Sequence, residues 1–449
     1  MSSGCPHAAL YQEELQPDPY AVYAKMRAEH GPIVPVELEP GIQGWLVTDY
    51  RTLITWCRDN VTFGRDARLW KDHREGRVGD AASVLPLMKP QPSALHSDGA
   101  EHQRYRRAIT ESIGAISDTH LASLTRQIAE HLIDTFCERG EADVLNEYAR
   151  LLPLLVVSEL LGLDEERGLR YARANRKVWL GEDVIRADAE AEQALVETVA
   201  DKRHSPGDDI TTRLLHHSSA LSDEEVIAQM ALLVAVANEP TAAFINSTLR
   251  AALTDPSGTT DRFLTGGELD DLVGRTLWQD PPITNYPVMY PRVDVTLDGG
   301  RIIEAGSPVL LGFAATNRFF VEENTEKITD SDNRAHVAWG AGDHRCPARD
   351  MALTIVTVAV RILLSRLPEL RLAVSPADLR WRLTGLVWAP VALPVKFAPQ
   401  SPLSRATEAE GGQGVSTGPG GTPRSERSTS RKSMSSSLSS FLRKLLRGG

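Results

Sequence analysis

A cysteine behind a glycine-rich turn is the residue of this chain with the clearest capacity for chemistry. The segment reads Trp339-Gly-Ala-Gly-Asp-His-Arg-Cys346, and an apolar segment with helical spacing, 352–367, follows it. A thiol at such a loop-to-helix junction faces backbone N–H groups and the positive end of a helix dipole, which lower its pKa. A thiolate so placed can ligate a soft or borderline metal ion. The segment therefore predicts a thiolate metal ligand at Cys346.

Two side chains that can donate hydrogen bonds are spaced so that they share one face of a predicted helix. His102 and Arg106 lie four residues apart, and residues at i and i+4 are neighbours on a helix surface. Two hydrogen-bond donors that point the same way suit a ligand with paired carboxylates. A solvent-exposed basic helix is the alternative that this spacing leaves open.

A long apolar segment, 222–253, contains an interruption that packing alone does not require. It begins with a capping box, Ser222 to Glu225, and continues almost wholly apolar, as a helix buried on all sides would. Glu239 and Pro240 then interrupt it. An interior proline removes a backbone hydrogen bond and kinks a helix, at a cost of about 3 kcal/mol. Such a break beside a buried carboxylate indicates a functional site, with a tolerated kink at a helix junction as the alternative.

These motifs together resemble those of the cytochrome P-450 superfamily. The haem loop of that family reads F-G-x-G-x-H-x-C-x-G. The positions that agree with it are Gly340, Gly342, His344 and Cys346. Trp339 replaces the phenylalanine, and Ala348 replaces the last glycine. The resemblance covers 10–398 and is strongest to atypical actinobacterial members of the soluble bacterial class, which lack the Glu-x-x-Arg motif.

The resemblance implies a haem b cofactor and gives roles to particular residues. Cys346 would be the axial ligand of the haem iron. The residues placed beside the haem are His102, Arg106 and His344. His102 and Arg106 would contact its propionates. A further propionate-binding arginine of the family falls on Met289, with Arg292 as a stand-in.

The resemblance also implies that the interrupted segment takes part in oxygen activation. The family reads A-G-x-(D/E)-T there, and this chain has Val236-Ala-Asn-Glu-Pro240 in that register. Glu239 would be the acid that relays protons. The usual threonine is replaced by Pro240. Thr241 lies one residue later, about 100° around the helix, and is the substitute.

A second family motif is replaced on both sides. Where the family has Glu-x-x-Arg, a buried ion pair that braces the haem-side core, this chain has Arg275-Thr-Leu-Trp278. A buried ion pair is often no more stabilising than well-packed apolar groups. The packing of Trp278 can therefore substitute for it.

The elements that must position these residues are mainly helical. Apolar residues recur at three- and four-residue spacing in 20–29, 122–139, 148–163, 187–202, 222–253 and 352–367. Strand-like segments are 32–36, 44–48, 293–297, 309–313, 370–374 and 391–397. We therefore expect a mainly α fold with a small β-sheet region, which the resemblance identifies as the cytochrome P-450 fold.

Composition excludes several classes of function. The chain has 449 residues and a net charge of −11, which argues against nucleic acid as the main partner. Its four cysteines form no CxxC pair and are expected to be thiols in a reducing compartment. We find no segment of about 20 apolar residues, as a membrane span requires, and no secretory signal at the start. The expected location is the cytoplasm.

The composition changes near residue 399. We expect a haem domain at 1–398 and a disordered, Gly/Ser-rich basic tail at 399–449, because that stretch cannot bury enough surface to fold. Near its end, apolar residues share a helical face beside basic ones: Phe441, Leu442, Leu445 and Leu446. This segment suits contact with a membrane surface or a partner protein, and a solvated tail end is an equal alternative.

The function that the resemblance implies is monooxygenation: one oxygen atom of O2 inserted into a small hydrophobic substrate. The electrons would come from a separate ferredoxin-type partner, which would dock on a basic face formed by Arg104, Arg107, Arg345 and Arg349. The residues expected in the substrate pocket are Val236, Ala237, Ile283 and Val288. A non-catalytic haem-binding sensor or scaffold and a peroxide-driven haem enzyme are the alternatives, because two supporting motifs are altered.

Overall fold

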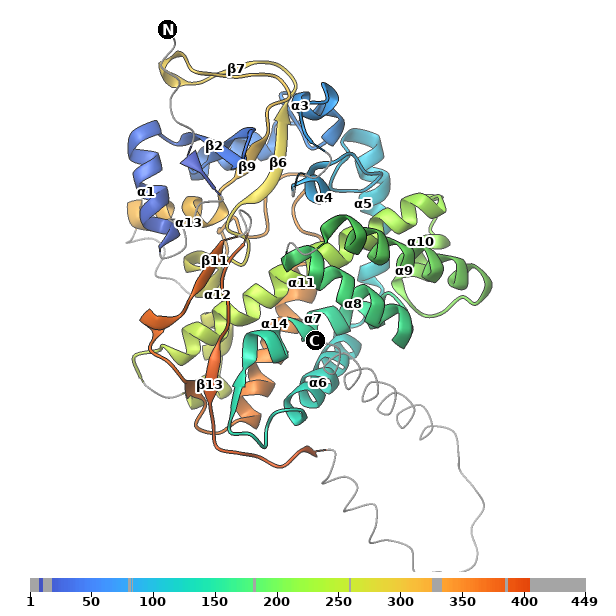
Figure 1. Ribbon diagram of the computed structural model, residues 1–449, viewed down its shortest axis with the longest axis vertical. Coiled ribbons are helices and arrows are strands. Elements are labelled where there is room, and N and C mark those ends of the chain that lie inside the picture. The colour runs from blue at the N-terminus through green and yellow to red at the C-terminus, as the bar shows by residue number, and fades with distance from the viewer. Residues whose placement is uncertain are drawn as a thin grey trace, which may run out of the picture.

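Helices dominate the computed structural model, as the periodicity predicts (Figure 1). It describes residues 8–10, 18–79, 82, 84–180, 183–257, 260–324, 333–383 and 387–403. The helices are α1 (Pro19–His30), α2 (Tyr50–Arg58), α3 (Lys71–Arg74), α4 (Leu85–Met88), α5 (Gly99–Gly114), α6 (Asp118–Asp134), α7 (Leu151–Leu160), α8 (Glu165–Leu180), α9 (Val184–His204), α10 (Ile210–Leu215), α11 (Asp223–Leu253), α12 (Glu268–Gln279), α13 (Phe313–Glu323) and α14 (Arg349–Arg366).

The principal sheet has the strand order β1-β2-β3-β9-β6-β4. Its strands are β1 (Ala8–Ala9), β2 (Ile33–Glu39), β3 (Ile42–Val47), β9 (Val309–Leu311), β6 (Tyr286–Pro291) and β4 (Phe63–Gly64). The outermost pair is antiparallel, with Gly64 opposite Tyr290. The sequence pattern did not predict β6, because its two prolines obscure the strand signal.

Short strands complete the described fold in three small sheets. The first joins β10 (Arg371–Leu372), β13 (Pro394–Lys396) and β5 (Glu141–Asp143). The others pair β11 (Trp381–Leu383) with β12 (Trp388–Pro390), and β7 (Val295–Thr296) with β8 (Ile302–Ile303). The expected mainly α fold with a small β-sheet region is confirmed.

The helix α11 runs through the middle of the molecule, between the sheet and the helices α6 to α10 (Figure 1). Its N-terminus has the predicted capping box, in which Ser222 and Glu225 bond to each other's backbone N–H groups. It packs against α7, α9, α12 and α14. Its length and apolarity would suit a membrane span, yet 56% of its most apolar window is buried within the fold. Burial of this kind is typical of the core helix of a globular domain.

An aromatic cluster stands where the family would have its Glu-x-x-Arg ion pair. The indole of Trp278 stacks on Phe320 at 6.0 Å and meets the ring of His336 edge-on at 5.7 Å. Its Nε1 donates a hydrogen bond of 2.7 Å to the carbonyl oxygen of Asn333. Phe320 in turn stacks on Tyr50 of α2. These contacts are the packing that the sequence proposed in place of the ion pair.

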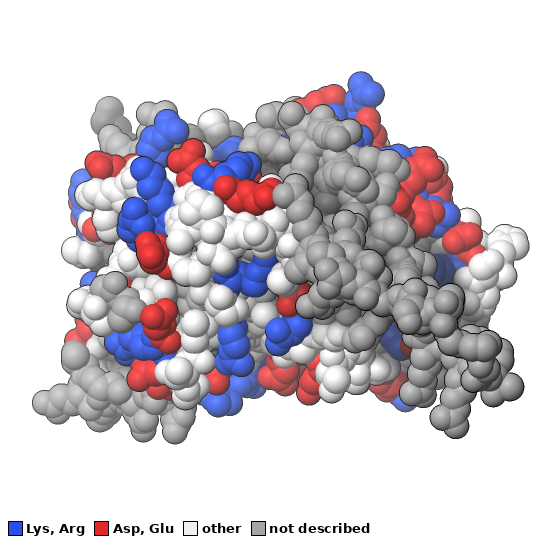
Figure 2. Space-filling model, turned by 90° about the horizontal axis from the view of Figure 1, so that it is seen from below, with Lys and Arg blue, Asp and Glu red and all other residues white. Residues whose placement is uncertain are grey.

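Residues 399–403, which follow the expected boundary at 398, are among the described residues. The backbone N–H of Gln400 donates to the carbonyl oxygen of Cys137, and that of Leu403 donates to Asp134. The rest of the proposed tail, 404–449, lies outside the described residues. Figure 2 shows the face seen from below, where Lys/Arg and Asp/Glu side chains are interspersed among uncharged ones.

Candidate functional site

The loop before α14 is shaped by two glycines in the left-handed region. Gly340 and Gly342 have φ values of 70° and 69°, a conformation that favours glycine. A side chain at Gly342 would overlap the carbonyl oxygen of Cys57 on α2. The backbone N–H of Cys346 donates a 2.9 Å hydrogen bond to the carbonyl oxygen of Trp339. The loop is thereby closed on itself with the cysteine at its end.

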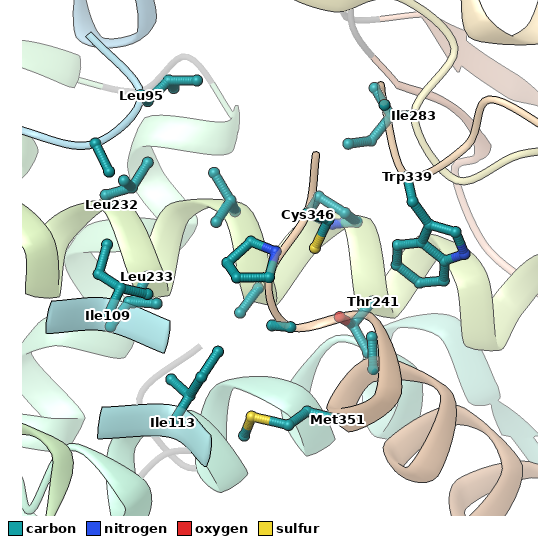
Figure 3. Close-up of a pocket in the computed structure, with 18 of the residues that line it drawn as sticks. Leu95, Ile109, Ile113, Leu232, Leu233, Thr241, Ile283, Trp339, Cys346 and Met351 are labelled. Carbon is teal, nitrogen blue, oxygen red and sulfur yellow. The ribbon is translucent and has the colours of Figure 1, made fainter. Parts of the chain in front are cut away.

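The sulfur of Cys346 faces an internal cavity of about 190 Å³ (Figure 3). Burial raises the pKa of the Cys346 thiol, against the backbone N–H of Ala348 and the charges of Arg106 and Arg345. The sequence predicted a lowered pKa from the helix terminus, whereas in the fold desolvation is the largest influence on this thiol and acts in the opposite direction. A metal cation reverses this balance, because a coordinating thiol is deprotonated.

The cavity wall away from the cysteine is apolar. It is formed by side chains of α5, α11 and adjoining segments, including Leu95, Ile109, Ile113, Leu232 and Leu233 (Figure 3). Of the four predicted pocket residues, Val236, Ala237 and Ile283 line the cavity. Val288 does not, because it points to the other side of β6 and packs in the core beneath the sheet.

Among the described residues, the charged side chains that line the cavity are Arg65 and Arg106, both cationic. The guanidinium of Arg106 donates to the carbonyl oxygen of Arg345 and forms no ion pair with a described carboxylate. Burial lowers the pKa of Arg106. Burial of the Arg106 charge in an apolar cavity is costly unless an anion accompanies it. The cavity is therefore built for a largely apolar ligand that carries negative charge.

Two histidines adjoin this cationic part of the cavity. The rings of His102 and His344 lie 4.1 Å apart, centroid to centroid. His344 lines the cavity. The Nε2 atom of His102 is buried and has no hydrogen-bond partner among the described residues. An orphaned donor here, beside the arginines, fits the carboxylates of a haem, so the residues present suit that cofactor.

Asp98, at the start of α5, contacts several groups at the cationic end of the cavity. Burial opposes its ionisation, but hydrogen bonds from His344 and from the backbone N–H groups of Arg65 and Asp66 lower its pKa to about 2. Its carboxylate pairs with Arg292 at 2.6 Å. Arg292 was predicted to bind the cofactor, but the structure does not bring it to the cavity, because Asp98 holds its guanidinium.

The two predicted catalytic residues, Glu239 and Thr241, point to different sides of α11. Thr241 and Pro240 line the cavity, and Figure 3 shows the Thr241 side chain near Cys346. Glu239 does not line it. Its carboxylate lies 3.8 Å from Nε of Arg150, and burial raises its pKa against the attraction of Arg150 and Arg382. The structure therefore brings Thr241 to the site and leaves Glu239 outside it.

Among the polar side chains that line the cavity, the sequence analysis gave no role to Arg65 or Tyr286. The guanidinium of Arg65 lies 5.5 Å from the centre of the Tyr286 ring, which stacks on Phe313. Neither belongs to a motif with a characteristic spacing. Only the arrangement of β4 and β6 brings them together.

Comparison with known proteins identifies the family. No protein-family model matches the sequence. Cytochrome P450 107B1 of Saccharopolyspora erythraea is 30% identical over 410 residues, 87% of this chain and 98% of the relative. Cytochrome P450 monooxygenase PikC of Streptomyces venezuelae is 29% identical over 86% of this chain and 92% of its own length. Vitamin D(3) 25-hydroxylase of Pseudonocardia autotrophica is 29% identical over 89% of this chain and 99% of its own length.

Solved structures agree with these relatives. CYP154A1 from Streptomyces coelicolor A3(2) superposes with a TM-score of 0.75 at 25% identity, covering 87% of this chain and 100% of that structure. The myxobacterial cytochrome P450 CYP267B1, in complex with myristic acid, has a TM-score of 0.75 at 25% identity, covering 87% of this chain and 99% of that structure. With a thiol-bearing loop, a cavity fitted to a haem and relatives of this kind, the chain belongs to the cytochrome P450 family of haem-dependent monooxygenases.

Proposed function

We propose that this protein binds haem b through the thiolate of Cys346 and inserts one oxygen atom of O2 into a small hydrophobic substrate. The observation that carries the proposal is the position of the Cys346 sulfur, which faces an apolar cavity whose charged lining residues are cationic. The apolar wall suits the macrocycle and a substrate, and the arginines suit the propionates. Haem held by the Cys346 thiolate, with its propionates beside the arginines, would account for both features.

When bound, the haem supplies the redox chemistry, and a thiolate ligand favours O–O cleavage. The chain contributes orientation and exclusion of water. The apolar side chains of α5 and α11 remove water from the wall that faces the substrate. Thr241 offers a hydroxyl in the cavity and can hold a water or a proton there. Glu239 lies outside the cavity, so we assign it no direct contact with the reacting atoms.

The lining indicates the class of substrate. No acidic side chain lines the cavity among the described residues, and its cations lie at the end where we place the propionates. A neutral, mostly apolar molecule therefore fits best. One related structure holds myristic acid, and one relative is named for hydroxylation of vitamin D(3), both of which are largely apolar molecules.

We infer that electrons arrive from a separate ferredoxin-type protein, which would dock near the Cys346 loop. Of the four arginines predicted for docking, Arg345 is exposed, and Arg349 has only a loose contact of 3.7 Å with Asp350. The other two are held in ion pairs: Arg104 with Glu225, and Arg107 with Glu111. Docking would therefore depend most on Arg345. A cytoplasmic location, and contact of the tail with a membrane or partner, remain part of this proposal.

Spectroscopy of the reduced protein with carbon monoxide tests the first step. The wild type and Cys57→Ala should show the absorption of a thiolate-ligated haem, and Cys346→Ala should lose it. Cys57 is a matched control because it is a buried thiol beside the same loop. Purified protein that takes up no haem would refute the proposal.

A peroxide-driven reaction is the second candidate, and the position of Glu239 favours it. An acid that faces Arg150 instead of the cavity cannot deliver protons directly, and a peroxide-driven enzyme would not need the same relay. Turnover with ferredoxin and reductase, with hydrogen peroxide, or with neither separates a monooxygenase, a peroxide-driven enzyme and a non-catalytic sensor.

A further inference from the structure

Gln229 of α11 is a buried amide, 0% exposed, that does not line the cavity and to which no motif gives a role. Its Oε1 atom accepts a 2.9 Å hydrogen bond from the backbone N–H of Ala94. Its Nε2 atom donates a 2.7 Å hydrogen bond to the carbonyl oxygen of Pro92 and one of 3.0 Å to that of Glu225 in its own helix. The amide therefore joins α11 to the segment 92–94 through both of its polar atoms.

The segment that Gln229 holds is irregular backbone inside the fold, between α4 and α5. Ser93 and His96 are buried, and Oγ of Ser93 lies 2.9 Å from Nδ1 of His96. The other ring nitrogen of His96 lies 3.0 Å from the carbonyl oxygen of Leu87 on α4. A buried backbone group without a partner costs free energy comparable to a lost hydrogen bond. Because Gln229 supplies partners for two such groups, its removal favours movement of the segment toward water.

The segment contributes the side chain of Leu95 to the cavity. Figure 3 shows Leu95 on the same side of the cavity as Leu232 and Leu233, away from Cys346. Leu232 and Leu233 follow Gln229 by three and four residues, so they share its face of α11. Gln229 thus lies one helical turn before the cavity-lining part of α11 and acts on the cavity through the segment that it holds.

We propose that Gln229 is a positioning residue: by holding the segment 92–94 against α11, it keeps Leu95 in the cavity wall and limits the length of the apolar ligand that the cavity accepts. The inference rests on the haem binding and the apolar substrate class proposed above. It adds that the substrate end remote from the reacting carbon meets Leu95. Gln229 itself lies outside the cavity and does not touch the substrate.

Titration of the haem-loaded protein with N-alkylimidazoles of increasing chain length measures this limit without relying on activity. The imidazole nitrogen ligates the haem iron and the alkyl chain occupies the cavity, so the shift in haem absorption gives a Kd for each length. In the wild type, Kd should fall with each added methylene until the chain meets Leu95, and should rise beyond that length. In Gln229→Leu and in Leu95→Ala, the first chains too long for the wild type should bind on the order of ten-fold more tightly, the effect of about two further buried methylene groups. Imidazole itself should bind to every variant equally.

A double-mutant cycle separates an action through Leu95 from a general loosening of the fold. If Gln229 acts through Leu95, adding Gln229→Leu to Leu95→Ala should change the Kd of the long chains no further, whereas independent effects would add. Tyr148→Phe is the matched control. It removes a buried side-chain hydrogen bond of 2.7 Å to the carbonyl oxygen of Ala359, and neither residue lines the cavity. This variant should keep the chain-length profile of the wild type.

Amide hydrogen exchange of a peptide that covers 92–97 tests the contact itself. Exchange of this peptide should be faster in Gln229→Leu than in the wild type, and unchanged in Tyr148→Phe. If Gln229→Leu does not fold, by circular dichroism, Gln229→Glu decides by the same titration. Its carboxylate can still accept from the N–H of Ala94 but cannot donate to the carbonyl oxygen of Pro92.

Three results would overturn the role of Gln229: a chain-length profile or an exchange rate that does not change in Gln229→Leu, additive effects in the double variant, or the same changes in Tyr148→Phe. A failure of the proposed function looks different. Wild-type protein that contains no haem, or whose spectrum does not respond to imidazole itself, would contradict the proposed haem binding.

Discussion

Nε of Arg150 lies 3.8 Å from the carboxylate of Glu239, on the side of α11 that faces away from the cavity. The side chain of Glu239 is 15% exposed and that of Arg150 is 30% exposed. The family resemblance predicted that Glu239 relays protons, but its carboxylate instead belongs to a partly buried ion pair. The oxygen-activation motif is therefore divided between two sides of α11: Glu239 faces Arg150, whereas Pro240 and Thr241 face the cavity.

We expect Glu239→Gln to retain most of the turnover of the wild type. Loss of a general acid that acts on the substrate costs about 10²–10⁴ in rate, and a residue outside the cavity should cost far less. The measurement is kcat and product yield with a surrogate ferredoxin and reductase. A hundred-fold drop in kcat with an intact haem spectrum would restore Glu239 as a proton donor.

The same substitution has a defined effect on stability against pH. Burial raises the pKa of Glu239 above its ordinary value of 4.5, so the native state binds its proton more tightly than the unfolded state. Stability from this group is present below pH 4.5 and is lost as pH rises through the folded-state pKa. The Tm of Glu239→Gln minus that of wild type should therefore increase from pH 4.5 upward. A difference that shrinks with rising pH would contradict the raised pKa.

Gly342→Ala should destabilise the protein more than Gly76→Ala does. Both glycines have φ of 69°, which costs an alanine about 1–2 kcal/mol. A methyl group at Gly76 would meet no atom of the described residues within 4 Å, whereas one at Gly342 would meet the Cys57 carbonyl oxygen. Chemical denaturation gives the free energy of unfolding of both variants, and the difference between them is the cost of the steric overlap at Gly342. The haem content of the purified variants reports whether the loop still holds Cys346 in a position to bind haem. Equal free energies of unfolding would show that the α2 contact relaxes freely.

Local patterns account for the parts of the site that the sequence predicts. Cys346 follows from its loop, and Arg106 follows from its spacing on one helix, because both signals lie within a few residues. The direction of Glu239 does not follow, since it depends on how α11 is rotated against Arg150. Arg65 was missed for a related reason: β4 and β6 are far apart in the chain, and only their pairing places it at the cavity.

Trp278→Ala should cost about 3–5 kcal/mol of stability, as truncation of a packed aromatic side chain does. Trp278→Phe should cost about 1–3 kcal/mol, because it keeps the ring contact with Phe320 but leaves the Asn333 carbonyl oxygen without its donor. Denaturant titration followed by circular dichroism gives both values. If Trp278→Ala is as stable as wild type, the aromatic cluster does not replace the family's ion pair.

Thr241→Ala should lower the yield of product per electron pair, because it removes the hydroxyl that α11 presents to the cavity. A single neutral hydrogen bond contributes about 0.5–1.5 kcal/mol, so the yield should fall by up to about ten-fold. Thr248→Ala is the matched control, since Thr248 is a buried threonine of the same helix that does not line the cavity. The assay compares NADH consumed with product formed and hydrogen peroxide released. Peroxide release should rise in Thr241→Ala alone. If the product formed per NADH is unchanged in that variant, or falls equally in both variants, Thr241 has no part in the reaction. Pro240 would then be the defining change of this helix.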